Sequence, residues 1–332
     1  MNKKRIEWID NMRGICMILV ILHHAGAPEE YQKFLSPFFL SGFFFISGYL
    51  FDNPNKDFDW KLKLIRIFET LVIPYFIYWA ISYFFIAGYN EVWKNGNYDV
   101  FVPFLKDLFL GKKLWFMSAL IVSEIVLVFI LPLIRKSNIY LIFTALVFIA
   151  LWNFTPLSRT GVFYPWYINN ACISIFFMLS GILFRKIQIL EMNNILFCAA
   201  IVYPILFIAD IYLDITGIMF ASNYFNNILI FIVYAIAGIL GLVYLCKRYI
   251  LEENLLSYYG RNSLLIYFFC NQIIILCFKI TSTIDINWYI KSLIITLMVC
   301  IVITIPVYVS NKFFPWMCGK FNRISTSYIQ RK

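Results

Sequence analysis

Hydrophobic residues in this chain are grouped into long runs, and most polar residues lie in short segments between them. Ten runs are long enough to cross a lipid bilayer, which takes about 20 residues, with a range of about 17–25. Each crossing must be helical, because hydrocarbon offers no partner for unpaired backbone groups. The runs are 9–27, 34–51, 64–87, 114–134, 139–154, 166–184, 195–213, 225–246, 263–278 and 288–309. The pattern therefore predicts an all-α, polytopic integral membrane protein with about ten transmembrane helices.

The composition of the 332 residues supports this class. Hydrophobic residues make up 62% and charged residues 14%, against roughly 45–50% and 25% in soluble domains. A soluble particle of this length could not bury so much apolar surface, and the same figures exclude a disordered chain, a disulfide scaffold and a coiled coil. Most of the eight cysteines lie within apolar runs and none forms a C-x-x-C pair, so we expect packing roles and no metal site.

The basic residues predict the orientation of the helices. The net charge of +10 comes from short clusters between apolar runs, which is typical of membrane topology and not of nucleic-acid binding. With the N-terminus in the cytoplasm, 20 of the 28 Lys and Arg residues fall on the inner side and 8 on the outer side. We therefore expect an even number of crossings with both termini cytoplasmic.

One connection, residues 88–113, is much longer than the others and carries aromatic residues among polar ones. Long loops in compact domains are usually functional, so a lid over a site is one interpretation. An amphipathic segment resting on lipid headgroups is the other. The sequence leaves both open.

Ionisable residues inside apolar runs are costly and are therefore candidates for function. On the first helix, Arg13 and His24 are eleven residues apart, which is about three turns, so both face the same way about 16 Å apart. His23 points elsewhere by about 100°. Arg13 is expected near the cytoplasmic surface and His24 deeper in the same polar stripe. A structural hydrogen bond of His24 to a neighbouring helix is the alternative.

A second candidate group lies at the inner end of the third helix, where Lys61, Lys63 and Arg66 cluster. They could anchor the helix at the inner surface, or bind a phosphorylated cytoplasmic cofactor, since Lys and Arg bind phosphate well. Glu69 is one turn beyond Arg66, and we expect an ion pair between them.

Glu124 is expected near the middle of the fourth crossing. A carboxylate at that depth is protonated or paired with a cation such as His24, and a His–carboxylate pair would orient a general base. Pairing with polar groups of a neighbouring helix is equally consistent with the sequence.

Small and aromatic residues complete the pattern. Gly42 and Gly48, six residues apart on the second helix, are expected to let helices approach closely. Four aromatic residues at outer helix ends are expected to form an interfacial belt, and stacking on a sugar is the alternative: Trp115, Tyr164, Trp166 and Trp288.

Together these segments resemble the membrane-bound acyltransferase family 3, and within it the fucose 4-O-acetylase-like branch. The resemblance rests on the order and spacing of several motifs along the whole chain. They are Trp8-Ile9-Asp10-Asn11-Met12-Arg13-Gly14 with His24-Ala25, Gly42-Phe43-Phe44-Phe45-Ile46-Ser47-Gly48, Lys63-Leu64-Ile65-Arg66 before Pro74-Tyr75, Leu114-Trp115-Phe116-Met117-Ser118-Ala119-Leu120 with Glu124, and Gly260-Arg261-Asn262-Ser263-Leu264-Leu265-Ile266-Tyr267. Two positions depart from the family pattern: Lys63 replaces the usual arginine, and Cys270 replaces a frequent histidine.

The resemblance implies one transmembrane acyltransferase domain over residues 1–332, in the plasma (inner) membrane of a bacterium. It implies transfer of an acetyl group from cytoplasmic acetyl-CoA to a hydroxyl of a cell-envelope or exported glycan, or of a lipid-linked sugar. His24 and Glu124 would be catalytic, with His24 as general base or acyl carrier, and Arg13, Lys63 and Arg66 would hold CoA phosphates. No metal and no nucleic acid is expected. The alternatives are a transporter or flippase of envelope precursors, and a sensor that has lost catalysis; no inverted repeat is visible to favour a transporter.

Overall fold

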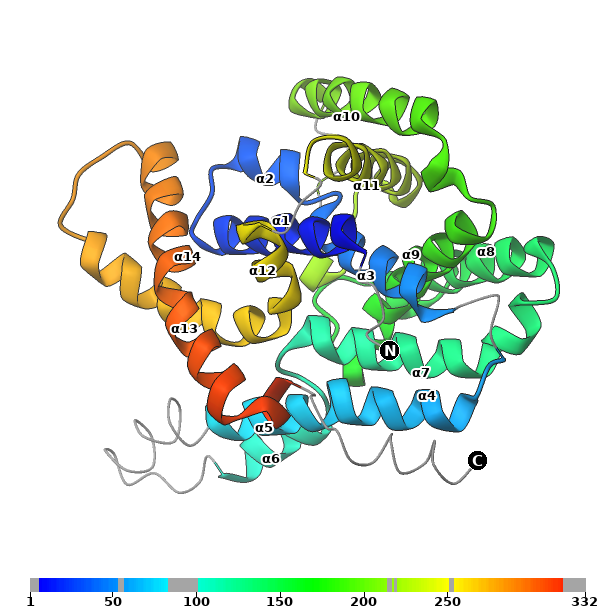
Figure 1. Ribbon diagram of the computed structural model, residues 1–332, viewed down its shortest axis with the longest axis horizontal. Coiled ribbons are helices and arrows are strands. Elements are labelled where there is room, and N and C mark those ends of the chain that lie inside the picture. The colour runs from blue at the N-terminus through cyan, green and yellow to red at the C-terminus, as the bar shows by residue number, and fades with distance from the viewer. Residues whose placement is uncertain are drawn as a thin grey trace. The chain divides into compact units, whose positions relative to one another are not determined.

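The computed structural model describes residues 6–52, 57–82, 101–213, 217, 220–250 and 254–318, and nearly all of them lie in helices or short turns. The chain divides into two compact units. Unit 1 comprises Met1–Phe51, Ser180–Phe220 and Tyr224–Val309, and unit 2 comprises Asp52–Leu179, Ala221–Asn223 and Ser310–Lys332. Helices α9 and α14 contribute to both units. The ribbon in Figure 1 shows the helices and their labels.

In unit 1, helix α1 is surrounded by other helices and packs against α12, α3, α13 and α11, while α10 packs along α11. The helices of this unit are α1 (Glu7–His24), α2 (Glu29–Leu35), α3 (Phe39–Phe51), the second part of α9 (Ile168–Lys186), α10 (Asn193–Leu213), α11 (Ile228–Tyr249), α12 (Leu255–Arg261), α13 (Ser263–Thr281) and most of α14 (Trp288–Phe313). A short 3₁₀ turn lies at Ile189–Glu191, and another, Phe220–Ser222, begins in this unit and ends in unit 2.

Helices α1 and α12 approach each other backbone to backbone. A Cβ added to Gly260 would lie 1.8 Å from the carbonyl oxygen of Asp10, and one added to Gly14 would lie 2.0 Å from that of Leu256. Asn11, fully buried beside this contact, donates its side-chain N–H to the carbonyl of Ile250 at 2.9 Å. The opening motif and the late Gly-Arg-Asn-Ser motif of the sequence therefore contact each other.

Gly42 of α3 also lies at a helix contact, as its small size predicts. A Cβ there would meet the ends of the Cys16 and Met12 side chains of α1 at 3.3 Å. Gly181 of α9 lets the backbone of α3 approach closely at Phe45. The expectation that small residues on the second predicted helix permit close helix packing is confirmed for Gly42.

In unit 2, the segment from α4 to the π turn packs against α7, which also contacts α8 and the turn before α9. The elements are α4 (Trp60–Ile67), the π turn η1 (Phe68–Val72), α5 (Ile73–Ser82), α6 (Phe101–Phe109), α7 (Trp115–Ile134), α8 (Asn138–Phe154) and the first part of α9. Short 3₁₀ turns lie at Pro156–Ser158, Pro165–Tyr167 and Pro315–Cys318, and the last of these packs on α5.

All ten predicted runs correspond to helices, although residues 83–87 of the third run lie outside the described residues. Eight helical segments of the described chain are long and apolar enough to span a membrane. The two others have clear reasons for falling short. Helix α8 has 17 residues, and α1 carries Glu7, Asp10 and Arg13 within its 18 residues. The all-helical, multi-pass membrane class is confirmed.

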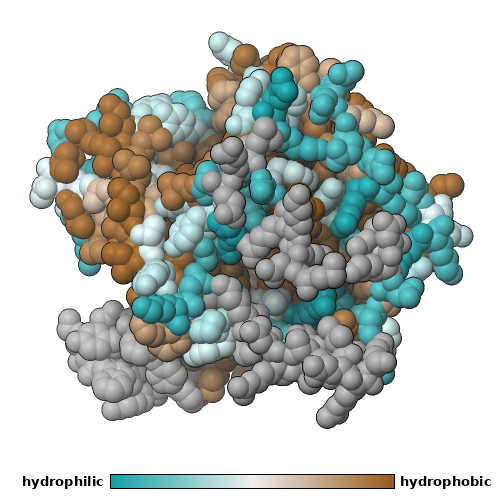
Figure 2. All heavy atoms as spheres, viewed as in Figure 1, coloured by the Kyte–Doolittle hydropathy of each residue, from teal (hydrophilic) through white to brown (hydrophobic). Residues whose placement is uncertain are grey.

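Helix α14 shows directly how the apolar surface is divided. Ile295, Val299, Ile303 and Val307 are fully buried, four residues apart on one face. Another face of the same helix is also apolar, but its side chains are 47–65% exposed: Leu293, Leu297, Ile301 and Ile305. Figure 2 shows hydrophobic residues gathered over α13 and α14. An exposed apolar surface of this extent indicates contact with lipid.

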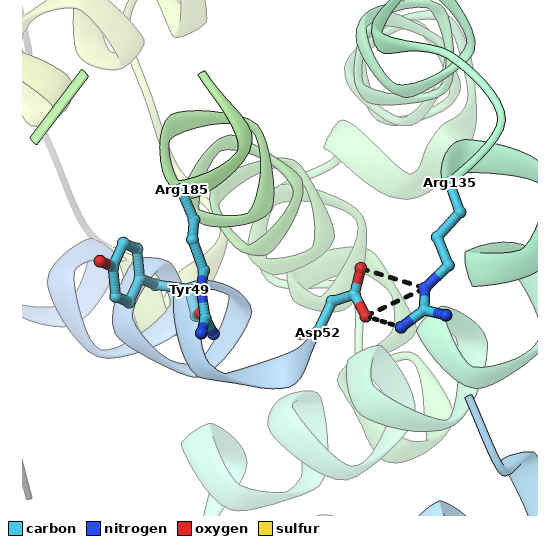
Figure 3. A network of polar contacts seen from close by, with 4 residues as sticks. All are labelled: Tyr49, Asp52, Arg135 and Arg185. Atoms are coloured by element: carbon cyan, nitrogen blue, oxygen red, sulfur yellow. Dashed lines mark hydrogen bonds and ion pairs between the residues drawn. The ribbon is translucent and has the colours of Figure 1, made fainter. Parts of the chain in front are cut away.

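Polar contacts within each unit join segments that were predicted on the same side of the membrane. In unit 2, Arg135 after α7 donates from Nε to both carboxylate oxygens of Asp52, at 3.0 and 3.2 Å (Figure 3). In unit 1, Arg185 donates to the carbonyl of Tyr49 at 2.9 Å, and Lys247 pairs with Glu191 at 3.1 Å. Arg135, Arg185 and Lys247 are among the 20 basic residues that the predicted topology assigns to the inner side. That this side is the cytoplasm stays a prediction.

Candidate active site

The residues predicted for the site fall into two groups. Arg13 and His24 lie on α1 in unit 1. Lys63 and Arg66 on α4, and Glu124 on α7, lie in unit 2. The pairing of His24 with Glu124 stays a prediction.

His24 is the last residue of α1, and its side chain is exposed. The helix is continuous from Glu7, so the predicted alignment of Arg13 with His24 about 16 Å apart follows from regular helical geometry. Arg13 is half-buried. The described residues offer His24 no hydrogen-bond partner, so both ring nitrogens are available to a substrate.

The chain directly after His24 is held in a tight turn. Gly26 has φ +76°, and a Cβ at that position would lie 2.9 Å from the indole ring of Trp288. The indole N–H of Trp288 donates to the carbonyl of Gly26, and the ring stacks on Phe278 with 6.2 Å between centroids. A second contact between the same segments joins the hydroxyl of Tyr289 to Glu30 at 2.8 Å. The start of α14 thus fixes the end of α1 that carries His24.

His23, which helical spacing predicts to point away from His24, places a second imidazole beside it. Its ring lies edge-on to His24, with 5.4 Å between centroids, and 5.7 Å from Phe39. Its Nδ1 atom is buried without a hydrogen-bond partner in the described chain. The sequence offered no signal for this contact, because neighbouring helix positions diverge by about 100°.

In unit 2, the two cations predicted to bind phosphate lie in the short helix α4. Asp59 caps α4 by accepting the backbone N–H of Leu62 at 3.0 Å. One turn later Lys63 is half-buried, and Arg66 at the last turn of α4 is exposed. Both cations therefore lie near the beginning of the apolar helical segment Trp60–Ser82.

The ion pair predicted between Arg66 and Glu69 does not form, so this expectation is wrong. Arg66 is exposed, whereas Glu69 is only 3% exposed. The reason is a change of helix type: residues 68–72 form a π turn, in which the N–H of Ile73 donates to the carbonyl of Phe68, five residues back. The i,i+3 spacing then no longer brings the two side chains together.

Glu124 lies in the middle of α7 and is half-buried. The adjacent Ser123 is fully buried, and its hydroxyl donates to the carbonyl of Ala119 at 2.7 Å. Because α7 packs against both α4 and η1, unit 2 places the helix bearing Glu124 against the segment bearing Lys63 and Arg66.

The N-terminal end of α7 is bordered by an aromatic turn that several hydrogen bonds hold in place. The backbone and the indole N–H of Trp166 donate to the carbonyls of Leu110 and Phe109 at 2.8 and 2.9 Å, and Tyr167 donates to that of Lys112. Of the long connection, residues 101–109 form α6, whose end is fixed by these bonds. Residues 88–100 lie outside the described residues, and the lid and interfacial interpretations both stay predictions.

Cys270, where the family pattern often has histidine, is buried in α13, and its thiol contacts the carbonyl of Tyr267 at 3.4 Å. The position is therefore filled by a packed side chain in unit 1 with a bond to its own helix. Nothing about this thiol suggests a replacement for an imidazole.

Comparison with known proteins agrees with the sequence motifs. The profile of a protein family described as an acyltransferase domain matches residues 6–310, which is nearly the whole chain. No curated protein and no solved structure matches the chain. The match runs from the start of α1 into the last turn of α14, so both groups of candidate residues lie inside it.

Proposed function

Because this chain belongs to the acyltransferase 3 family, and is thus a multi-pass membrane acyltransferase, we propose that it transfers an acetyl group from acetyl-CoA to a hydroxyl of a cell-envelope or exported glycan. The enzyme would act in the plasma membrane of a bacterium. The donor would come from the cytoplasm, and the acceptor would be a polysaccharide or a lipid-linked sugar. The fucose 4-O-acetylase-like branch, suggested by the sequence motifs, is part of this proposal.

The observation that carries the proposal is the exposed imidazole of His24 at the end of a helix whose other polar face residue is Arg13. Imidazole titrates near neutral pH and suits proton transfer. His24 is the last residue of a regular helix, and the turn that follows it is held by Trp288, so the backbone at His24 has a defined orientation. A purely structural histidine would be expected to bond a neighbouring helix, which is not what the described residues of unit 1 show.

The proposed reaction is a direct transfer. His24 takes the proton of the acceptor hydroxyl as the oxygen attacks the thioester carbonyl. The new C–O bond forms, the C–S bond of the thioester breaks, and the CoA thiolate leaves and is protonated. In this proposal, Glu124 stabilises the imidazolium that forms. A covalent acyl-histidine is the second route, and it would form the same products.

We expect the cations of α1 and α4 to hold the acetyl-CoA donor. Arg13, Lys63 and Arg66 carry the positive charge that CoA phosphates require. Lys63 binds phosphate as a point charge, whereas the exposed guanidinium of Arg66 offers two parallel donors. We therefore expect Arg66 to contribute more to donor affinity than Lys63.

The test uses the full-length protein purified in detergent, with acetyl-CoA and a soluble sugar acceptor or water. We expect His24→Ala to abolish release of free CoA thiol while expression and thermal stability are kept. His23→Phe is the matched control, because it removes the neighbouring imidazole but keeps an aromatic ring against Phe39. Full activity of His24→Ala would refute the catalytic role.

The acceptor is tested in cells. Mass spectrometry of envelope glycans from a deletion strain should show a missing acetyl increment, restored by the wild-type gene and not by His24→Ala. Unchanged glycans combined with a defect in lipid or glycan export would favour the transporter alternative. For the donor, Arg66→Ala should raise the KM for acetyl-CoA more than that for the acceptor.

A further inference from the structure

The π turn of unit 2 carries a carboxyl group that the proposed mechanism does not use. Glu69 lies within a helical segment of 23 residues, Trp60–Ser82, that is apolar enough to span a membrane. Its side chain is 3% exposed, and its Oε1 atom is buried with no hydrogen-bond partner among the residues that the structure describes. An ionisable group at such a position is costly and needs a reason.

A structural role does not account for this carboxyl. The expected partner, Arg66, is exposed and makes no ion pair with it, and the side chain of Thr70 bonds the carbonyl of Arg66 at 2.8 Å rather than the carboxyl. Leaving a buried acceptor unsatisfied costs more than replacing it with an apolar side chain. A buried acceptor with no partner among the described residues is therefore suited to a hydrogen-bond donor that a ligand brings.

The backbone at Glu69 supports the same reading. The π turn is one residue wider than an α-helical turn, as the bond from Ile73 to Phe68 shows, and such turns are frequent at functional sites. Pro74, two residues after the turn, has no backbone N–H to donate to the helical hydrogen-bond pattern. Phe68 and Thr70, on either side of Glu69, are exposed, so the turn reaches the surface of the described structure.

The position of Glu69 relative to Arg66 indicates which part of the acyl donor would lie beside its carboxyl group. It is three residues beyond Arg66, or about 4.5 Å along a helix, in the direction away from the cationic end of α4. If Arg66 binds the phosphates of CoA, the part of the donor that follows them is the pantetheine arm. That arm carries a hydroxyl and an amide N–H within a few bonds of the diphosphate, and both donate hydrogen bonds.

We propose that Glu69 is a binding residue for the pantetheine arm of the acyl donor, accepting a hydrogen bond from its hydroxyl or first amide. This inference rests on the proposed function. It divides recognition of the donor along one helix: the phosphates at Lys63 and Arg66, and the arm at the π turn. Glu69 takes no part in proton transfer in this scheme.

The test separates the two parts of the donor by equilibrium binding, measured as competition against a fluorescent CoA analogue. The probes are CoA, pantetheine, and adenosine 3′,5′-bisphosphate, which has phosphates but no arm. Glu69→Met, which keeps the length of the side chain, should weaken pantetheine and CoA about tenfold or more and leave the bisphosphate unchanged. Arg66→Ala should do the reverse, weakening the bisphosphate and CoA but not pantetheine.

Two further variants keep the result interpretable. Glu69→Gln retains an acceptor oxygen without charge and should lose less affinity than Glu69→Met. Thr70→Ala changes an exposed residue of the same turn and should bind all three probes as the wild type does. Unchanged bisphosphate binding by Glu69→Met also shows that the variant is folded.

The outcomes distinguish this inference from the function on which it rests. Unaltered pantetheine affinity in Glu69→Met, or equal weakening of all probes, overturns the role of Glu69 while leaving acetyl transfer from acetyl-CoA intact. A wild-type protein that binds no CoA overturns the proposed donor and the inference together. Kinetics give a second readout: Glu69→Met should raise the KM for S-acetylpantetheine but not for S-acetyl-N-acetylcysteamine, which lacks the hydroxyl and the first amide.

Discussion

The backbone contact between α1 and α12 gives a sharp prediction for stability. At Gly260, an alanine Cβ would lie 1.8 Å from the carbonyl oxygen of Asp10, and ordinary contact begins at 3.4 Å. The obstructing atom is backbone, so α12 and α1 would have to separate by about 1.6 Å, which opens a packed interface. At Gly14, the Cβ would lie 2.0 Å from the carbonyl oxygen of Leu256, again backbone.

We expect Gly260→Ala and Gly14→Ala each to destabilise the protein by roughly 3 kcal/mol, at the upper end of what overpacking usually costs. The intrinsic helix preference of alanine offsets about 1 kcal/mol at most. For a chain of 332 residues, the corresponding fall in apparent Tm is about 4 °C. The measurement is a thermal unfolding scan of the detergent-purified protein at one scan rate for all variants.

Gly42→Ala is the matched control. It is the same substitution in a helix that packs on α1, but the nearest atoms are the ends of the Cys16 and Met12 side chains at 3.3 Å, which can shift. Its apparent Tm should stay close to that of the wild type. Equal Tm values for Gly260→Ala, Gly14→Ala and Gly42→Ala would refute the close approach of the two backbones.

Two other predictions concern an ion pair of unit 2 and a hydrogen bond of unit 1. Arg135→Ala removes the guanidinium that pairs with the carboxylate of Asp52, a residue that is 5% exposed, and should destabilise the protein by about 3 kcal/mol. Combining Asp52→Asn with Arg135→Ala should recover part of this loss in a double-mutant cycle of unfolding scans, and additive effects would contradict the pairing. Trp288→Phe keeps a ring beside Phe278 but removes the N–H that is donated to the carbonyl of Gly26. We expect kcat to fall several-fold with little change in the KM for acetyl-CoA, and an unchanged kcat would show that this bond does not hold the turn after His24.

The helices could be predicted because their signal is local. An apolar run of sufficient length must be helical in a membrane, and this holds for each run whatever its neighbours are. The alignment of Arg13 with His24 also follows from one uninterrupted helix. The same reasoning failed for Arg66 and Glu69, because it assumed α-helical spacing where the chain forms a π turn.

Contacts between distant segments lay beyond this reasoning. Gly14 and Gly260 are about 250 residues apart, and no periodicity connects them. The only sequence feature that they share is that each belongs to a motif of the family resemblance. The same applies to Trp288, whose place at a helix end suggested a lipid belt, although its N–H bonds the turn after His24. The roles of His24, Glu124, Arg13, Lys63 and Arg66 stay predictions.

The π turn also sets the rotational phase of everything that follows it in its helix. A π turn is equivalent to one residue inserted into an α-helix, and one residue corresponds to about 100° of rotation. Tyr75, Tyr78 and Trp79 are at most 2% exposed in the present phase. Deleting a single residue between Phe68 and Val72 would swing this aromatic face out of the protein, so an indel at this point would be far more damaging than most substitutions.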